Sequence, residues 1–377
     1  MLDLAQRFEA EQEDLDALCA ERDWSRTELF LPNEYYGIAS ILKRYAGYPQ
    51  QRPVKAVVPH GIYQNDHELA DFERKAGLAA ALVYPQYRLG LYRDRGRMLE
   101  VPSAAPFVYA ERLMSAHPPR SGALFFPAHS LPGLTVEMDL EAAADALDAL
   151  PEAMKPLTVI VYWHDYLLGR HRPFADRGYR IVSAGHIYDS EFLPRLCYLL
   201  KSHVYVISNA VGSHVFYALQ AGCTVRLVEM PYRRSGSEAD LRLKAPTLTD
   251  ARRAAVDEIA ALFSQQVATP TQAQRRAADF YLGIEHALAP SEMKDLLQWL
   301  DRLDRFGRAL YWRDSGERFD ARPATPGLVP AGVRRVLVRT LPSLAERATR
   351  RVVSGTIALL RRLMPFLRNV RLRGRSG

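Results

Sequence analysis

Between residues 122 and 229 the sequence alternates short β-rich runs with amphipathic stretches. The β-rich runs cover residues 123–129, 157–165, 180–186, 203–209 and 224–229. The stretches at 141–151, 190–202 and 213–222 have apolar residues at helical spacing. Because strands that alternate with helices pair in parallel through right-handed crossovers, this pattern predicts a doubly wound α/β sheet.

The residues before this region favour a second, similar unit. Residues 54–60 form an apolar run that ends in His60-Gly61, which is typical of a buried parallel strand entering a loop. Residues 80–87 and 106–114 are further strand or strand-to-helix candidates, and the basic segment 88–99 is expected to be a loop. The segment 117–122, HPPRSG, interrupts the pattern. We therefore expect two Rossmann-like domains with parallel sheets, at 1–118 and 119–248.

The last third of the chain has a different pattern. After Pro231 the sequence turns helical, and helices that pack back across both domains are expected over 249–321. A Pro-rich linker and a basic tail follow over 322–377.

The composition indicates a globular protein in a reducing compartment. With 48% hydrophobic and 25% charged residues, the chain is unlike disordered, collagenous or coiled-coil sequences. Its 3 cysteines are too few and too scattered for a disulfide framework or a cysteine-rich zinc site. The acidic N-terminus is unlike a signal peptide, and no run approaches 18 apolar residues. A soluble or peripherally attached cytoplasmic protein is expected.

The net charge of +7 is concentrated at one end of the chain. Residues 331–377 contain 12 Arg and a single acid, Glu346, whereas the remaining residues carry a small net negative charge. From Ser343 to Leu367 the apolar residues recur at roughly helical spacing, which predicts an amphipathic helix on an anionic membrane surface. Nucleic-acid binding is the competing interpretation, but the apolar content exceeds what phosphate contacts need. The third interpretation is a disordered tail without a binding partner.

Polar residues follow most of the predicted strands. They are His60, His129-Ser130, His164-Asp165, His186 and Ser208-Asn209. Ligands of open parallel sheets bind beyond the carboxyl ends of the strands. A single histidine there is most often a hydrogen-bonded, non-catalytic side chain, but five polar strand ends at one edge favour a binding site.

The segment 207–229 has the most specific pattern. A strand ends in Ser208-Asn209, and a turn with Gly212-Ser213 opens a helix. Gly212 would let a ligand approach the backbone, Ser213 could cap the helix, and the helix N-terminus attracts phosphate. On spacing alone, an ordinary capped turn explains the pattern slightly better.

Residues 203–229 resemble the nucleotide-sugar segment of GT-B glycosyltransferases of the sialyl-, Kdo- and polyol-phosphate-transferring kind. FFPAHS (125–130), SAGHIYDSEFL (183–193) and PHGIY (59–63) extend the resemblance over roughly residues 30–310. It implies two Rossmann-like domains facing a cleft and transfer of a sugar from a nucleotide-sugar to a glycan in surface-polysaccharide synthesis. No predicted strand ends in an Asp-x-Asp metal motif of the GT-A type, which agrees with a metal-independent GT-B site, and the paired glutamates of retaining enzymes are not evident. An inverting reaction without a metal or cofactor is therefore expected.

The resemblance assigns candidate roles to residues of this chain. His60 is the candidate base, with Asp165 and Asp189 in reserve. A glycan or lipid-linked glycan would be the acceptor. Tyr36 and Tyr188 are candidates to line its groove, although most tyrosines pack in cores. The candidate donor-binding residues are His129, Ser130, His186, Ser208, Asn209, Gly212, Ser213, His214 and Glu229.

Other chemistries fit the sequence less well. The spacing around His164 and His171 matches no metal signature, and Ser213 lacks the second glycine of a hydrolase elbow. Two other interpretations stay open: a non-hydrolysing sugar-nucleotide epimerase, which needs a pair of acids, and a non-catalytic scaffold of a membrane complex. The oligomeric state does not follow from the sequence.

Overall fold

A computed structural model describes residues 4–11, 14–62, 71–84, 88–92, 98–114, 118–244, 250–264 and 267–314. All of these residues belong to one compact unit within residues 1–328. The predicted linker and basic tail over 322–377 lie outside the described residues.

A five-stranded parallel sheet forms the centre of the fold. Its strand order is β6-β5-β3-β7-β8, so the first and fourth strands in sequence lie side by side. Each lies within one of the five β-rich runs, which confirms the predicted parallel α/β sheet. After β3 the chain adds β5 and β6 on one side of it, and then β7 and β8 on the other side. The boundary between β3 and β7 is therefore a topological switch point, where ligands of such sheets bind. The strands are β3 (Ala123–Phe126), β5 (Leu157–Ile160), β6 (Arg180–Val182), β7 (Tyr205–Ser208) and β8 (Thr224–Leu227).

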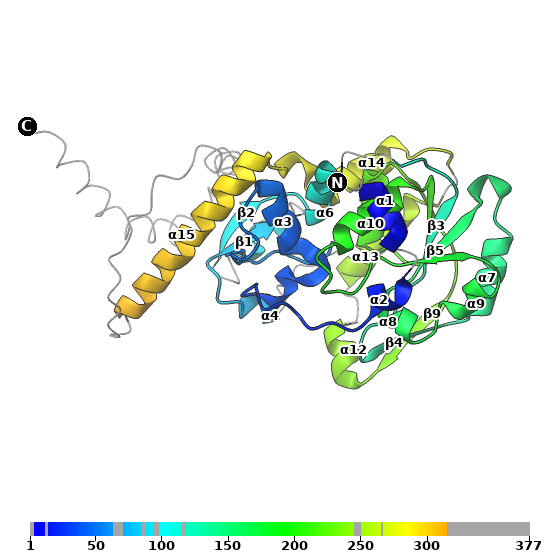
Figure 1. Ribbon diagram of the computed structural model, residues 1–377, viewed down its shortest axis with the longest axis horizontal. Helices are drawn as coiled ribbons and strands as arrows, with labels where there is room; N and C mark the ends of the chain where they lie inside the picture. Colours follow the sequence, from blue (N-terminus) through cyan, green and yellow to red (C-terminus); the bar gives the residue numbers. More distant parts are fainter. Residues whose placement is uncertain are drawn as a thin grey trace, which may run out of the picture. The chain divides into compact units, whose positions relative to one another are not determined.

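Helices lie on both sides of this sheet. Figure 1 shows α7 (Leu140–Asp148) and α9 (Arg172–Ala175) on one side of β3 and β5, and α1 (Leu4–Glu11) and α10 (Phe192–Lys201) on the other. On the α7 side, Phe125, Val159 and Leu147 belong to one buried apolar cluster. Helix α11 (Ser213–Gln220) connects β7 to β8. The apolar residues of the amphipathic stretches therefore form the core that orients the strand ends.

Two parts of this region differ from the prediction. The predicted strand 157–165 ends at Ile160, and its last residues begin helix α8 (Trp163–Leu167). The segment after Pro231 was expected to be helical, but it forms β9 (Tyr232–Gly236), which pairs antiparallel with β4 (Leu134–Met138). In β4, buried residues alternate with accessible ones. One face of this two-stranded ribbon therefore packs against the protein, and the other face is open to solvent.

The first part of the chain contains a smaller parallel sheet. Strands β1 (Ala80–Val83) and β2 (Leu99–Pro102) pair in parallel, and Val57 bridges to Ala81. Strand β2 begins inside the segment expected to be a loop, and the candidate strand at 106–114 is helix α6 (Pro106–Leu113). The described residues before 118 thus show a mixed α/β arrangement, while a second full Rossmann-like domain stays a prediction. The other helices here are α2 (Leu15–Cys19), η1 (Leu31–Asn33), η2 (Tyr35–Gly37), α3 (Ile38–Ala46) and α4 (Asp71–Arg74).

The helices after β9 pack against the region of the five-stranded sheet and against the first part of the chain. Phe216 of α11 contacts Tyr281 of α14, with ring centroids 4.6 Å apart. Lys55 pairs with Asp304 of α15 at 3.3 Å. No helix of the described residues is both long enough and apolar enough to cross a membrane. The helices are α12 (Glu238–Lys244), α13 (Asp250–Ala261), α14 (Gln272–Leu282), η5 (Ile284–His286) and α15 (Pro290–Asp314), and η4 (Glu152–Met154) precedes β5.

Candidate functional site

Asn209 joins the loops that follow three neighbouring strands. Its Oδ1 accepts a hydrogen bond from the Ala128 N–H at 2.8 Å, after β3. Its Nδ2 donates to the Met230 carbonyl at 3.0 Å, after β8. The side chain that the resemblance assigns to the nucleoside therefore spans the switch point and holds its loops together.

His214 occupies the space just beyond β3 and β7. Its Nε2 lies 2.9 Å from Ser208 Oγ, and its ring stacks on Phe126 with centroids 4.6 Å apart. A Cβ at Gly212 would lie 2.9 Å from His214 Nδ1, so the imidazole leaves room only for glycine at that position. Burial lowers the pKa of His214 to about 3, and the imidazole is neutral at physiological pH.

The first turn of α11 contacts the first part of the chain. Gly212 is the N-cap residue, and no side chain caps the helix. The expectation that Ser213 caps α11 is therefore wrong. Instead, Ser213 Oγ accepts a hydrogen bond from the Ile62 N–H at 2.9 Å. The loop of His60 thus reaches the N-terminus of α11, where backbone N–H groups lack helical partners.

A series of aromatic and imidazole rings connects the loop after β3 to Tyr35 and His60 in the first part of the chain. Starting at the loop after β3, the contacts run His129–Tyr162 at 4.4 Å, Tyr162–Trp163 at 5.9 Å and Trp163–His186 at 4.1 Å between ring centroids. They continue as His186–Tyr188 at 5.4 Å, Tyr188–Tyr35 at 5.9 Å and Tyr35–His60 at 5.3 Å. We call this set the aromatic belt: Tyr35, His60, His129, Tyr162, Trp163, His186 and Tyr188.

The histidines of the aromatic belt have lowered pKa values. Burial lowers the pKa of His60 to about 4, with a further contribution from Arg88. Burial, followed by the charge of Arg22, also lowers the pKa of His186 to about 4. The pKa of His129 is lowered mainly by burial. Neutral imidazoles can accept a proton or donate one N–H, but they supply no fixed positive charge to a ligand.

Tyr36 adjoins the belt in a strained backbone conformation. Its φ of 58° and ψ of 16° lie in the left-handed region, which a bulky residue rarely adopts. The Tyr36 N–H donates to the Ile187 carbonyl at 2.6 Å, and its ring packs on Phe192 at 4.7 Å. A Cβ on the next residue, Gly37, would collide with the Ser190 carbonyl oxygen. This turn therefore attaches the first part of the chain to the loop between β6 and α10.

Asp165 and Ser130 lie close to each other and are buried. Asp165 Oδ2 accepts from the Ser130 N–H at 3.0 Å, and Arg170 Nε lies 3.1 Å from Oδ1. Ser130 Oγ accepts from the Val136 N–H at 3.0 Å. Both side chains are engaged in holding the loop after β3, so neither is well placed to act on a ligand.

Asp189 has a similar set of protein partners. Its Oδ2 lies 3.2 Å from Arg195 Nη1 and 3.3 Å from Arg22 Nη1. Its Oδ1 accepts from the Glu191 N–H at 2.9 Å. Both carboxylate oxygens of Asp189 are thus engaged by protein groups, which makes it a poor reserve for His60.

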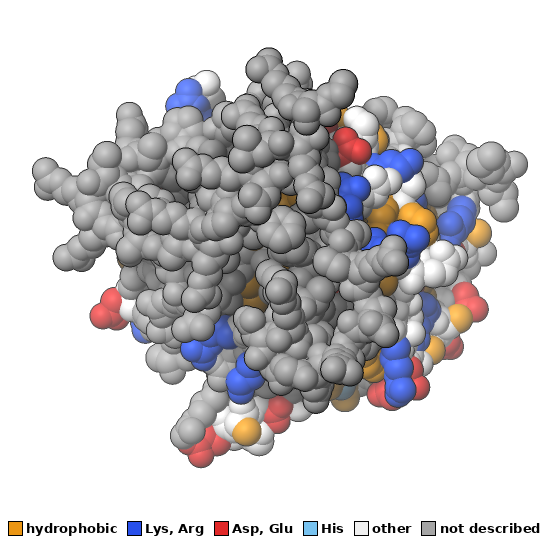
Figure 2. Space-filling view, turned by 90° about the vertical axis from the view of Figure 1, so that its left-hand side faces the viewer, with side chains coloured by type: hydrophobic (Ala, Val, Ile, Leu, Met, Phe, Trp, Pro, Cys, Tyr) orange, Lys and Arg blue, Asp and Glu red, His pale blue; other side chains and the backbone are white. Residues whose placement is uncertain are grey.

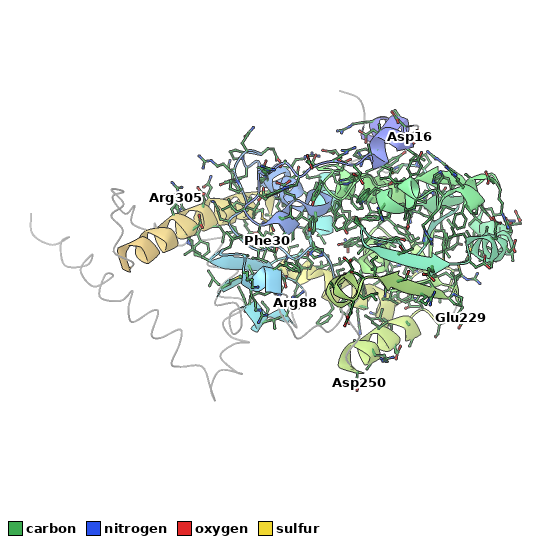
Figure 3. All side chains as sticks on the ribbon, turned by 90° about the horizontal axis from the view of Figure 1, so that it is seen from below. Asp16, Phe30, Arg88, Glu229, Asp250 and Arg305 are labelled. Atoms are coloured by element: carbon green, nitrogen blue, oxygen red, sulfur yellow. The ribbon has the colours of Figure 1, made fainter. Side chains whose placement is uncertain are left out.

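Glu229 lies just after β8, the edge strand that pairs with β7. It is exposed and lines a separate cavity of about 240 Å³ beside β8, together with Arg226 and Phe263. Figure 3 shows Glu229 well apart from Phe30 and from Arg88, whose charge acts on His60. Its chain neighbours bond to two other candidate donor-binding residues: the Val228 N–H donates to the Ser208 carbonyl at 2.9 Å, and the Met230 carbonyl accepts from Asn209 Nδ2 at 3.0 Å.

Three belt residues, Tyr35, Tyr162 and Trp163, are not among the site residues predicted from the sequence. Tyr162 lies between β5 and α8, next to a predicted strand end, and that position was the available signal. Tyr35 carried no such signal, because the turn at η2 depends on contacts with residues 187–190. The described residues contain no group of three or more His, Cys, Asp or Glu arranged to hold a metal ion.

Comparisons with known proteins identify no family. No family model and no curated protein sequence matches the chain. Among solved structures, the chain is similar to one chain in the crystal structure of a GtfA/B complex, with 14% sequence identity and a TM-score of 0.29. The similarity covers 70% of this chain and 55% of that chain, or about half its length. At this TM-score a shared fold is not shown, so the functional argument depends on the contacts described above.

Proposed function

We propose that this protein is a metal-independent glycosyltransferase that moves a sugar from a nucleotide-sugar to a hydroxyl group of a glycan or lipid-linked glycan. The observation that carries the proposal is the hydrogen bond between Ile62 and Ser213 at the N-terminus of α11. It brings a neutral histidine, His60, close to the uncapped start of a helix at the topological switch point. One group could accept the proton of a hydroxyl while the other binds a phosphate leaving group.

The proposed roles follow from these positions. Backbone N–H groups around Gly212, Ser213 and His214 would bind the phosphates, and His129 and His186 would donate further hydrogen bonds. His60 would be the base, and Tyr36 and Tyr188 would contact the acceptor. An inverting reaction is proposed because it needs one base and no enzyme nucleophile. The epimerase alternative needs acids free to abstract protons, whereas Asp165 and Asp189 are held by arginines.

Nucleotide binding tests the proposal directly. CMP, UDP and GDP are titrated into the full chain, and binding is measured by calorimetry. We expect one of them to bind, and Gly212→Ala to weaken that binding at least about tenfold, because the new Cβ displaces His214 from the phosphate site.

The matched control for this substitution is Gly178→Ala. Gly178 has open space around its missing Cβ but a φ of +79°, so the variant tests backbone strain away from the site. It should bind the nucleotide as the unmodified protein does. Absence of binding for all three nucleotides would exclude the transferase function.

The place of action is also part of the proposal. We place the protein in the cytoplasm, at the inner face of a membrane, held by the basic segment 331–377. On the face drawn in Figure 2, basic and acidic side chains of the described residues are interspersed.

A further inference from the structure

A small cavity lies beside β8, at one edge of the five-stranded sheet. Its volume is about 240 Å³. Pockets for drug-sized ligands usually have about 300–1,000 Å³, so this one suits a smaller molecule. Strand β8 lines it, and Met154, Phe263 and Val267 add apolar side chains to the lining. We call the space between these residues the edge cavity.

The backbone of β8 directs two N–H groups toward the open edge of the sheet. The Thr224 N–H donates to the Val204 carbonyl at 2.9 Å, so Thr224 and every second residue after it bond to β7. Because the residues between them point to the opposite side of a parallel strand, Val225 and Leu227 direct their N–H groups away from β7. No described residue accepts a hydrogen bond from either group, and both residues line the edge cavity.

The edge cavity also contains an arginine without an acidic partner. Arg226 is half-buried, and no carboxylate of the described residues lies within ion-pair distance of its guanidinium group. Its Nη1 lies 3.9 Å from Met154 Sδ, which places the charged end at the cavity wall beside a weak acceptor. Removing a charge from water is costly unless the charge is paired, so this cation favours an anionic ligand.

The second charged residue of the lining limits the charge of that ligand. Glu229 is exposed and makes no ion pair with Arg226 or with any other described residue. A dianion would therefore meet repulsion as well as attraction. A single carboxylate matches the planar fork of a guanidinium group, because two parallel hydrogen bonds can form. The apolar side chains of the lining favour a ligand with an apolar body.

The geometry favours a small molecule over an added β-strand. Thr224 Oγ1 donates to the Ala268 carbonyl at 3.1 Å, so the chain that follows α13 lies against the start of β8. Phe263 and Val267 line the edge cavity from the same part of the chain. An extended peptide would have to displace these contacts in order to pair along the whole strand.

From these observations we propose that the edge cavity binds a small carboxylic acid with an apolar body. Arg226 holds the carboxylate through two hydrogen bonds, and the N–H groups of Val225 and Leu227 offer further donors at the same wall. Met154, Phe263 and Val267 contact the apolar body. The inference goes beyond the proposed transferase function, in which none of these six residues has a role.

The test titrates hexanoate into the full chain and measures binding by calorimetry. Hexanoate combines a carboxylate with a short apolar chain, and its dissociation constant should be below about 1 mM. Hexanamide has nearly the same shape without the charge, and inorganic phosphate has charge without the apolar chain. Both should bind at least about tenfold more weakly than hexanoate, because only hexanoate uses the charge-assisted pair and the apolar walls together.

Substitutions of Arg226 locate the binding. Arg226→Met removes the charge and keeps a long apolar side chain, and it should weaken hexanoate at least about tenfold. Arg226→Lys keeps the charge but loses the planar fork, and it should weaken hexanoate about threefold to tenfold. The matched control is Arg180→Met. Arg180 begins β6, the opposite edge strand, is exposed and does not line the edge cavity, so this variant should bind hexanoate as the unmodified protein does.

Thermal melts show whether the variants are folded. Substitution of an accessible arginine that has no acidic partner should change the melting temperature by less than about 2 °C. If Arg226→Met melts at a much lower temperature, Arg226→Lys decides instead, and hexanoate binding that this variant leaves unaltered overturns the proposal.

The remaining outcomes are equally distinct. Hexanoate binding that Arg226→Met abolishes and Arg180→Met retains supports the site. Absence of hexanoate binding at about 10 mM overturns it, as does unaltered binding by folded Arg226→Met. Hexanamide or phosphate that binds as tightly as hexanoate overturns it as well. Because no nucleotide enters these titrations, failure of the edge cavity leaves the transferase proposal standing, and failure of nucleotide binding leaves the edge cavity standing.

Discussion

Single residues with unusual backbone or steric requirements determine which side chains meet at the aromatic belt. Tyr36 and Gly37 both have positive φ, and together they place a tyrosine beside the loop of Ile187. Gly212 permits the His214 ring to stack on Phe126. At this scale, small local changes should alter chemistry more than stability.

His60→Ala is the test of the proposed base. We expect turnover to fall at least about a hundredfold while the affinity for the nucleotide stays within about twofold, because general bases contribute about that much to the rate. Since burial lowers the pKa of His60 to about 4, this group should cause no change in rate between pH 6 and 8. Normal turnover of the variant, measured with the nucleotide sugar that binds, would show that the base lies elsewhere.

His186 gives a prediction for stability against pH. Its pKa in the folded protein is about 4, below the usual 6.5, so the unfolded chain takes up a proton first as the pH falls. The contribution of neutral His186 to the free energy of unfolding should therefore be fully present above about pH 6.5, and it should be lost as the pH falls toward 4. Asp189 opposes this shift, and Arg22 supports it.

The variant His186→Asn isolates this contribution. Its Oδ1 can still accept the Tyr188 N–H, which His186 Nδ1 accepts at 3.2 Å. Thermal melts from pH 7.5 to 4.5 should show a shallower loss of stability for the variant than for the unmodified protein. Identical slopes would mean that His186 does not carry the effect.

Short elements outside the sheet support the strand ends. Helix α1 has only eight residues, yet Phe8 is completely buried and its ring lies 5.8 Å from that of Tyr198 in α10. Arg195 of α10 binds both Glu11 of α1 and Asp189, at 2.7 and 3.2 Å. The N-terminal helices therefore hold the loop that carries His186 and Tyr188.

Phe8→Ala should show how much α1 contributes. Removing a completely buried phenylalanine should lower the free energy of unfolding by about 3–5 kcal/mol, measured by urea denaturation. Phe280→Ala is the control, since Phe280 is 44% exposed, and it should change that free energy by less than about 1 kcal/mol. Similar values for the two variants would mean that α1 is not an integral part of the fold.

At the scale of the whole molecule, charge and chemistry occupy different segments. The candidate site lies within the compact unit 1–328, whereas the charge excess belongs to residues 331–377. The proposed membrane contact is thus separable from the proposed reaction.

Deletion of 331–377 tests that separation. The full chain should float with vesicles that contain anionic lipid and remain in the bottom fraction with neutral ones, because each Arg near an anionic surface contributes about 1 kcal/mol. The deleted protein should not float and should keep its nucleotide affinity. Equal flotation of both proteins would refute a tail anchor.

The sequence by itself determined the secondary structure of the central sheet. Each of the five β-rich runs contains a strand, and the helices at 140–148, 192–201 and 213–220 lie where the helical periodicity predicted them. This succeeds because hydrophobic periodicity is a local signal. Hydrophobic periodicity did not predict the β4–β9 ribbon, because its two strands are distant in sequence and their pairing is a tertiary contact.

Only the tertiary structure decided which polar residues are available to a ligand. Asp165 and Asp189 follow strands as predicted, but Arg170, Arg22 and Arg195 reach their carboxylates. Ser213 begins a helix as predicted, but its hydroxyl bonds to Ile62, 151 residues away. Hydrophobic periodicity predicts which residues lie at a strand end. The groups that bond to their side chains come from distant segments, which only folding brings together.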